Sequence, residues 1–201
     1  MVLSNFRTEI AFHRGYRAEE IIAKILRDEG YYVVFLADNQ ERGQNGAPGA
    51  RNRDDFITLP DLAVFLRGKQ GYVEIKFKAS ADFTVLTGRE EHGIGKRKWE
   101  MYCKIQKETG SLVYLFIYEG NSGAILYATI DELAPLMREY NGDKMDPGGM
   151  VFFARASFDL WGKIAVVDGQ IYDQLWLFSE DEGDKLFKLQ RKFSQEHTCK
   201  P

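Results

Sequence analysis

The chain has 201 residues, of which 44% are hydrophobic and 28% charged, and this excludes a disordered or fibrous protein. Its formal net charge of −3 argues against a protein coated with cations, although a local basic groove would still serve to bind nucleic acid. The two cysteines, Cys103 and Cys199, have no metal-type spacing, and we expect a reducing, cytoplasmic setting. The N-terminus lacks the apolar stretch of a secretory signal, and no apolar run approaches the ~20 residues of a membrane span.

The first third of the chain predicts a helix, a strand and a loop. Residues 5–29 have a helical pattern, which we expect to be interrupted near Gly15 and to stop at Gly30. Its apolar stripe consists of Ala18, Ile21, Ile22, Ile25 and Leu26. Residues 31–37 form a short apolar run typical of a buried strand. Residues 38–53 are polar and rich in glycine, and such a long loop in a compact domain is often functional.

The rest of the chain alternates between strand and helix patterns. Expected strands are residues 56–59, 61–66, 72–77, 112–118, 124–128, 151–156, 164–167 and 170–178. Expected helices are residues 96–109, 131–140 and 181–195, and residues 79–95 are expected to be a connecting stretch. No repeat or linker interrupts this order. We therefore expect one α/β domain over residues 1–201, with a core at about 5–128 and an extension at 129–201 that completes or decorates it.

Two of these strands carry charged residues that suit phosphodiester chemistry. A Pro-Asp pair places Asp61 at the head of one strand, and a Glu-x-Lys pattern places Glu74 and Lys76 on the same face of the next strand. A carboxylate and an amine within an apolar strand are costly to bury unless they are paired or bind a metal. Two carboxylates and a backbone carbonyl are hard oxygen ligands for Mg²⁺ or Mn²⁺. A nearby lysine could orient or deprotonate a water molecule, or offset negative charge in the transition state.

A third carboxylate is expected on the first helix. Glu19 shares a helical face with the apolar stripe, where packing alone does not explain an acid. Glu20 lies about 100° around the helix and could pair with Lys24 in an ordinary solvated arrangement. We prefer Glu19 as the functional acid and keep Glu20 as the alternative.

These segments together resemble the PD-(D/E)xK nucleases, in particular archaeal Holliday-junction resolvases and related phage and mobile-element nucleases. The matching segments are Gly15-Tyr16-Arg17-Ala18-Glu19, Gly30-Tyr31-Tyr32-Val33-Val34, Pro60-Asp61 and Glu74-Ile75-Lys76. The resemblance implies a restriction-endonuclease-like fold, a mixed central β-sheet flanked by helices. It also implies that Glu19 is the helix acid, that Asp61, Glu74 and the Ile75 carbonyl bind the metal, and that Lys76 is the catalytic lysine. Junction resolvases are shorter and more basic than this chain, so other roles in recombination, repair or defence stay open.

The function expected from this resemblance is metal-dependent cleavage of DNA, with the possibility of a homodimer that cuts both strands. The alternatives are cleavage of RNA, or an inactive binding module on the same fold. Positively charged candidates for DNA contacts are Arg51, Arg53, Lys78, Arg89, Lys96 and Lys98. Trp99 and Tyr102 could stack on a base or could belong to the core. His92 is expected at the surface, and no histidine pair has zinc spacing.

Overall fold

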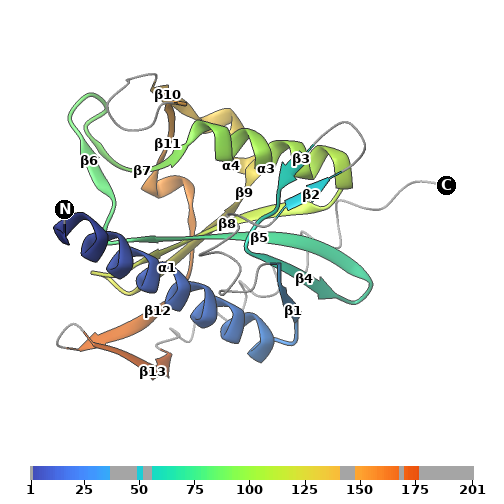
Figure 1. Ribbon diagram of the computed structural model, residues 1–201, viewed down its shortest axis with the longest axis horizontal. Coiled ribbons are helices and arrows are strands. Elements are labelled where there is room, and N and C mark those ends of the chain that lie inside the picture. The colour runs from blue at the N-terminus through green and yellow to red at the C-terminus, as the bar shows by residue number, and fades with distance from the viewer. Residues whose placement is uncertain (1, 37–48, 52–55, 141–147, 168–169, 177–201) are drawn as a thin grey trace.

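The computed structural model describes residues 2–36, 49–51, 56–140, 148–167 and 170–176. Its centre is a seven-stranded sheet in the order β1-β4-β5-β8-β9-β12-β13 (Figure 1). These strands are Tyr32–Phe35, Leu62–Leu66, Lys69–Lys78, Leu112–Glu119, Ala124–Thr129, Asp159–Val167 and Gln170–Trp176. Strands β5 and β8 run parallel, and the other neighbouring pairs are antiparallel. The mixed sheet that the sequence predicts is confirmed.

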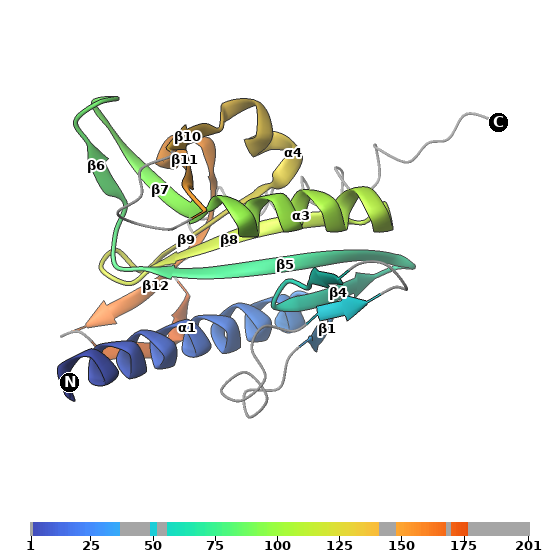
Figure 2. The same cartoon turned by 45° about the horizontal axis from the view of Figure 1, so that its top comes forward.

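Two helices cover opposite faces of this sheet (Figure 2). Helix α1 (Val2–Asp28) buries its apolar stripe against a cluster that includes Val73 and Ile75 of β5. Helix α3 (Lys96–Thr109) packs on the other face, against residues such as Leu115. The mixed sheet flanked by helices is the architecture expected of a restriction-endonuclease-like fold.

Helix α1 passes through Gly15 without a break, so the expected interruption is wrong. Glycine inside a helix costs only about 1 kcal/mol relative to alanine. Packing of the buried stripe against the sheet supplies more than that, because tertiary contacts provide most of a helix's stability in a folded protein.

A second, four-stranded antiparallel sheet has the order β10-β11-β7-β6. Its strands are Arg138–Tyr140, Met150–Ala154, Arg89–Gly95 and Asp82–Thr84, respectively. The expectation that residues 79–95 only connect two elements is therefore wrong. Strand β7 escapes notice in the sequence because its buried positions include Glu91 and His92, which break the apolar pattern of a strand.

The expected helix at residues 131–140 is much shorter in the structure. Helix α4 (Ile130–Leu133) has Thr129 as its N-cap, and the side chains of Thr129 and Glu132 form a capping box. A 3₁₀ turn, η1 (Ala134–Leu136), follows and contains a proline, which does not continue an α-helix. The chain then enters β10.

Three short elements complete the described structure, and some of the expected elements lie outside it. Strands β2 (Gly49–Arg51) and β3 (Phe56–Thr58) form a two-stranded ribbon, and a second 3₁₀ turn, η2 (Arg155–Ser157), separates β11 from β12. The expected helix at 181–195, most of the loop at 38–53, and Cys199 lie outside the described residues. Among the residues described, no helix is long and apolar enough to cross a membrane.

Candidate active site

A tight turn brings Asp61 next to Glu74. Arg67 and Gly68, which connect β4 to β5, both have positive φ (50° and 78°), as a two-residue type I′ hairpin requires. This turn fixes the register in which Leu62 pairs with Val73. Asp61 is one residue beyond that pair, and the backbone N–H of Ile75 donates a 2.8 Å hydrogen bond to its Oδ2.

Strand β5 turns Glu74 and Lys76 toward α3. Val73 and Ile75 alternate with them and pack in the cluster under α1. Glu74 is buried, Lys76 is partly exposed, and the Lys76 ammonium contacts Glu74 Oε1 directly. The charged pair of the Glu-x-Lys pattern therefore lies on the α3 face of the strand.

The Ile75 carbonyl faces the same side as Asp61. In a β-strand the N–H and C=O of one residue point to the same neighbour, and the N–H of Ile75 points to Asp61. Two residues beyond the Leu62–Val73 pair, the residue opposite Ile75 would be Pro60. Proline has no N–H with which to extend the ladder. Pro60 thus ends the β4–β5 ladder beside the hydrogen bond from the Ile75 N–H to the Asp61 carboxylate.

Glu19 reaches the site from the opposite face of the sheet, on α1. Its side chain is buried, and its charge raises the pKa of both Asp61 and Lys76. Glu20 is exposed and accepts a 2.6 Å hydrogen bond from the Tyr16 hydroxyl. Of the two candidates, the structure brings Glu19 and not Glu20 to the centre.

Burial and charge crowding shift the protonation of the site. Burial, followed by the charge of Glu74, raises the pKa of Asp61 to about 7, against the lowering effect of Lys76. Burial acts to lower the pKa of Lys76, but Glu74 and Asp61 outweigh it, and the pKa is raised. The lysine is therefore an ammonium at neutral pH, in a centre where carboxylates crowd one another.

The chemistry of these donors fits a divalent cation. Asp61, Glu74 and the Ile75 carbonyl provide oxygen ligands, and Mg²⁺ is usually bound by one or two carboxylates while it keeps several waters. Within the described part of the chain, no group of three or more His, Cys, Asp or Glu side chains could hold a metal ion by itself. The arrangement thus suits a metal that completes its shell with water and substrate oxygens.

Tyr102 of α3 is a site residue that the sequence does not single out for this role. It is buried, and its hydroxyl hydrogen-bonds to Glu74. Burial first, and then the charge of Glu74, raise the pKa of Tyr102 well above its ordinary value, so the hydroxyl stays protonated. Its helical spacing with Trp99 predicts the burial of both rings, which the structure has, but the partner of the hydroxyl depends on tertiary structure.

The residues expected to contact DNA fall into three groups. Lys78 lies on the same strand, two residues after Lys76. Burial lowers the pKa of Lys78, and so do the charges of Lys76 and Lys98, whereas the charge of Asp82 acts to raise it. Lys96 instead pairs with Glu139 at 2.6 Å, and Arg89 with Glu91 at 3.4 Å. Arg51 belongs to β2, with its side chain outside the described part of the structure, and Arg53 lies outside it altogether.

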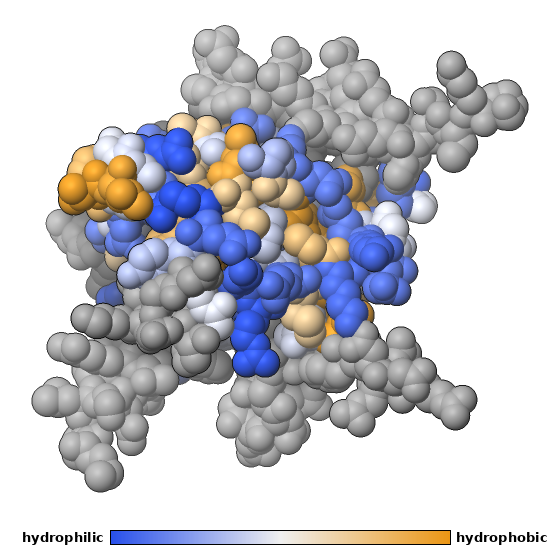
Figure 3. All heavy atoms as spheres, turned by 90° about the horizontal axis from the view of Figure 1, so that it is seen from above, coloured by the Kyte–Doolittle hydropathy of each residue, from blue (hydrophilic) through white to orange (hydrophobic). Residues whose placement is uncertain are grey.

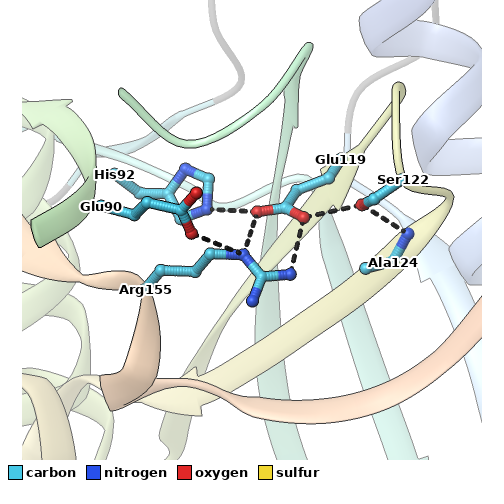
Figure 4. A network of polar contacts seen from close by, with 6 residues as sticks. All are labelled: Glu90, His92, Glu119, Ser122, Ala124 and Arg155. Atoms are coloured by element: carbon cyan, nitrogen blue, oxygen red, sulfur yellow. Dashed lines mark hydrogen bonds and ion pairs between the residues drawn. The ribbon is translucent and has the colours of Figure 1, made fainter. Parts of the chain in front are cut away.

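His92 is buried, so the expectation of a surface histidine is wrong. Its Nε2 lies 2.9 Å from Glu119 Oε1, and Arg155 donates to both oxygens of Glu119 at 2.7 and 2.8 Å (Figure 4). Ser122 donates a further 2.7 Å hydrogen bond to Glu119. Burial acts to raise the pKa of Glu119, but the donors, led by Arg155, lower it to about 2. This network ties β7, β8 and η2 together beside the end of β5, since Lys78 pairs with Glu119 in the sheet.

The fold and the site together define an α/β protein with a charged centre where β4 and β5 meet. No protein-family model and no curated protein matches the sequence. Among solved structures, the chain is similar to Hjc from Archaeoglobus fulgidus, a Holliday junction resolvase, at 10% identity and a TM-score of 0.47, over 72% of this chain and 91% of that one. It is also similar to D212, a nuclease from a fusselovirus, at 12% identity and a TM-score of 0.40, over 74% of this chain and 85% of that one. Identity this low does not transfer the catalytic residues of either protein to this chain.

Proposed function

We propose that this protein is a Mg²⁺- or Mn²⁺-dependent nuclease that hydrolyses phosphodiester bonds in DNA. The observation that carries the proposal is the proximity of the Asp61 carboxylate to the buried Glu74 and to Lys76, which pairs with it. A buried centre with more carboxylates than ammonium groups favours a divalent cation, and an adjacent lysine favours a substrate that becomes more negative as it reacts.

In this proposal Asp61, Glu74 and the Ile75 carbonyl hold the metal. When bound, such a metal lowers the pKa of a water molecule and screens charge on the phosphate. Lys76, which contacts Glu74 directly, would orient or deprotonate the attacking water, or offset the negative charge that develops on the phosphate. Tyr102 keeps Glu74 in place by its hydrogen bond.

Glu19 is the acid that completes the centre. Its buried carboxylate lies close enough to Asp61 and Lys76 to shift the pKa of both. In the proposed reaction it fixes the position of Lys76 and accepts a hydrogen bond from a water molecule in the site. Phosphates of the DNA backbone would bind Lys78 and Lys98; Lys78 lies close enough to both Lys76 and Lys98 for their charges to affect its pKa. A homodimer, if formed, would present two such centres to two strands.

The test is cleavage of end-labelled single-stranded, duplex and four-way-junction DNA with Mg²⁺, Mn²⁺ or EDTA. We expect cutting that requires metal and that is lost in Lys76→Ala. The matched control is Lys69→Ala, which removes a lysine from the other end of β5 and should leave the rate unchanged. Folding of each variant is checked by circular dichroism and thermal melting.

Two results would contradict the proposal. One is the failure of folded wild-type protein to cut any of these DNAs with either metal, and the other is a Lys76→Ala protein that cuts as fast as wild type. Binding of DNA without cutting would favour an inactive binding module, and cutting of RNA alone would change the substrate.

A further inference from the structure

The β6–β7 hairpin exposes apolar side chains at its tip. Phe83 is 66% exposed, Val85 88% and Leu86 82%. Three residues separate the end of β5 from the hairpin, which stands out from the body of the protein on the α3 side of the central sheet (Figures 1 and 2). Figure 3 shows an apolar patch at the corresponding edge of the molecule, next to a hydrophilic band. Exposed apolar side chains grouped on one hairpin provide a surface that a ligand can cover.

The base of this hairpin is firmly held. Strand β7 pairs with β11 over Glu91–Gly95, the Arg138 guanidinium contacts Glu91, and Glu119 binds His92. A side chain at Gly93 would come within 2.7 Å of the Phe152 ring, so the two strands pack closely. The apolar tip is therefore presented on a fixed support rather than on an open loop.

Positive charge lies between the tip and the candidate active site. Lys76 and Lys78 project from the same face of β5, and Lys98 lies close enough to Lys78 to affect its charge state. Asp82 at the start of the hairpin offsets part of this charge, and the exposed Glu90 lies 3.8 Å from Arg155. The lysines form a short track that suits a phosphate backbone leading from the cleavage centre to the hairpin.

We propose that the hairpin tip, formed by Phe83, Val85 and Leu86, is an apolar wedge that contacts unpaired bases of DNA whose backbone follows the lysine track. The substrate class is then DNA in which bases beside the cleaved strand are unstacked or splayed, in preference to uniform duplex. This inference rests on the proposed function, because the track leads to the proposed cleavage centre.

The size of the tip favours bases over a second protein. A stable protein interface buries roughly 800 Å² on each partner, which is more than three side chains supply. One or a few apolar side chains are enough to act as a wedge between bases or as a stacking platform. The neighbouring lysines complement phosphates and would repel the same surface of a second copy.

The test measures affinity by fluorescence anisotropy in EDTA, at one fixed salt concentration, for a forked DNA with unpaired arms and for a plain duplex of equal length. The variant is Phe83→Ser/Val85→Ser. Its matched control is Tyr32→Ser/Val34→Ser, which removes an exposed aromatic residue and an exposed valine from the edge strand β1. Gel filtration of all three proteins reports the oligomeric state.

We expect wild type and control to bind the fork at least about fivefold more tightly than the duplex, the lower end of what stacking on one base contributes. The tip variant should lose this preference while its duplex affinity changes less than twofold. The wedge is refuted if wild type shows no preference for the fork, if the tip variant keeps it, or if the variant changes the oligomeric state instead. A tip-dependent preference in a protein that cuts no DNA would refute the proposed function and leave the wedge standing. A protein that cuts DNA but shows no preference for the fork would support the proposed function and refute the wedge.

Discussion

The backbone N–H of Ile75 donates a 2.8 Å hydrogen bond to Asp61 Oδ2, so the carboxylate is held by the same strand that carries Glu74. An asparagine at position 61 would keep the size and an accepting oxygen but lose the negative charge. We expect Asp61→Asn to fold and to lose at least about 100-fold in cleavage rate, or ~2.7 kcal/mol, the scale seen when one electrostatic contact to a reacting centre is removed.

The measurement is the single-turnover rate at saturating Mg²⁺, together with Mn²⁺ affinity by calorimetry. Asp82→Asn, a change of an exposed aspartate to asparagine on β6, is the control and should cut at the wild-type rate. Wild-type metal affinity in Asp61→Asn would remove Asp61 from the proposed ligands.

The two neighbouring acids of α1 should differ sharply. Glu19 is buried and its charge reaches Asp61, whereas Glu20 is exposed and binds the Tyr16 hydroxyl. We expect Glu19→Gln to slow cleavage by about tenfold or more, within the range of positioned acid–base groups, and Glu20→Gln to change it less than about twofold. The measurement is the cleavage rate of both variants and of wild type in one buffer. A larger loss of rate in Glu20→Gln than in Glu19→Gln would make Glu20 the helix acid.

Tyr102 should act by positioning Glu74. Tyr102→Phe removes only the hydroxyl that hydrogen-bonds to Glu74 and keeps the buried ring. Loss of a hydrogen bond to a charged group costs about 1.5–3 kcal/mol. We expect weaker Mn²⁺ binding and a raised metal requirement for cleavage, with a maximal rate near wild type at saturating metal. Tyr72→Phe, on β5 and paired with Gln70, is the control. A purely structural role would lower the thermal midpoint but leave the metal dependence unchanged.

The sequence predicts the part of the fold that depends on local pattern. Helix α3 has the predicted bounds, because glycines stand at both of its ends and apolar residues recur at helical spacing between them. The common face of Glu74 and Lys76 follows from the alternation of side chains along a strand. Strand β5 starts at Lys69, however, three residues before the predicted strand at 72–77, so the tight Arg67–Gly68 turn that brings Asp61 close is not among the predictions.

The parts that the sequence does not predict depend on partners far along the chain. His92 reads as a surface residue because its partner, Glu119, is 27 residues away, and Arg155 is farther still. Strand β7 is not predicted either, because buried polar residues stand where an ordinary strand has apolar ones. The hydrogen bond between Tyr102 and Glu74 requires that α3 dock on β5, which no local pattern reveals.

Glu29 gives the protein a predicted dependence of stability on pH. Burial raises the pKa of Glu29 to about 7. Between about pH 4.5 and 7 the folded state therefore binds more protons than the unfolded state. The free energy of unfolding falls as pH rises through this window. We expect Glu29→Gln to flatten the fall.

The comparison is made in Asp61→Asn protein without metal, because burial raises the pKa of Asp61 in the same direction. Urea unfolding at pH 5, 6 and 7 measures the slope. Equal slopes with and without the Glu29→Gln change in that background would show that Glu29 titrates normally.

Arg155 should be worth more to stability than its partial exposure suggests. It supplies two hydrogen bonds to Glu119, a carboxylate that is almost fully buried. Removing one partner of a buried charged pair leaves the other uncompensated and costs about 3–5 kcal/mol when both are buried. Since Arg155 is partly exposed, we expect about 2–3 kcal/mol for Arg155→Met, between that value and the cost of an ordinary charged hydrogen bond.

A double-mutant cycle that combines Arg155→Met with Glu119→Gln checks this prediction. Urea unfolding measures the free energy of unfolding of each variant. Arg155→Met should cost much less in a Glu119→Gln background, because the charge left behind is gone. Arg89→Met is the control. Arg89 is exposed and has a single 3.4 Å contact with Glu91, a carboxylate that Arg138 also binds. We expect this variant to lose less than about 1 kcal/mol in free energy of unfolding. If Arg155→Met costs the same in the Glu119→Gln background, then the packing of its side chain, and not the charge of Glu119, accounts for the loss. In that case the network would not be the support that the hairpin and its wedge require.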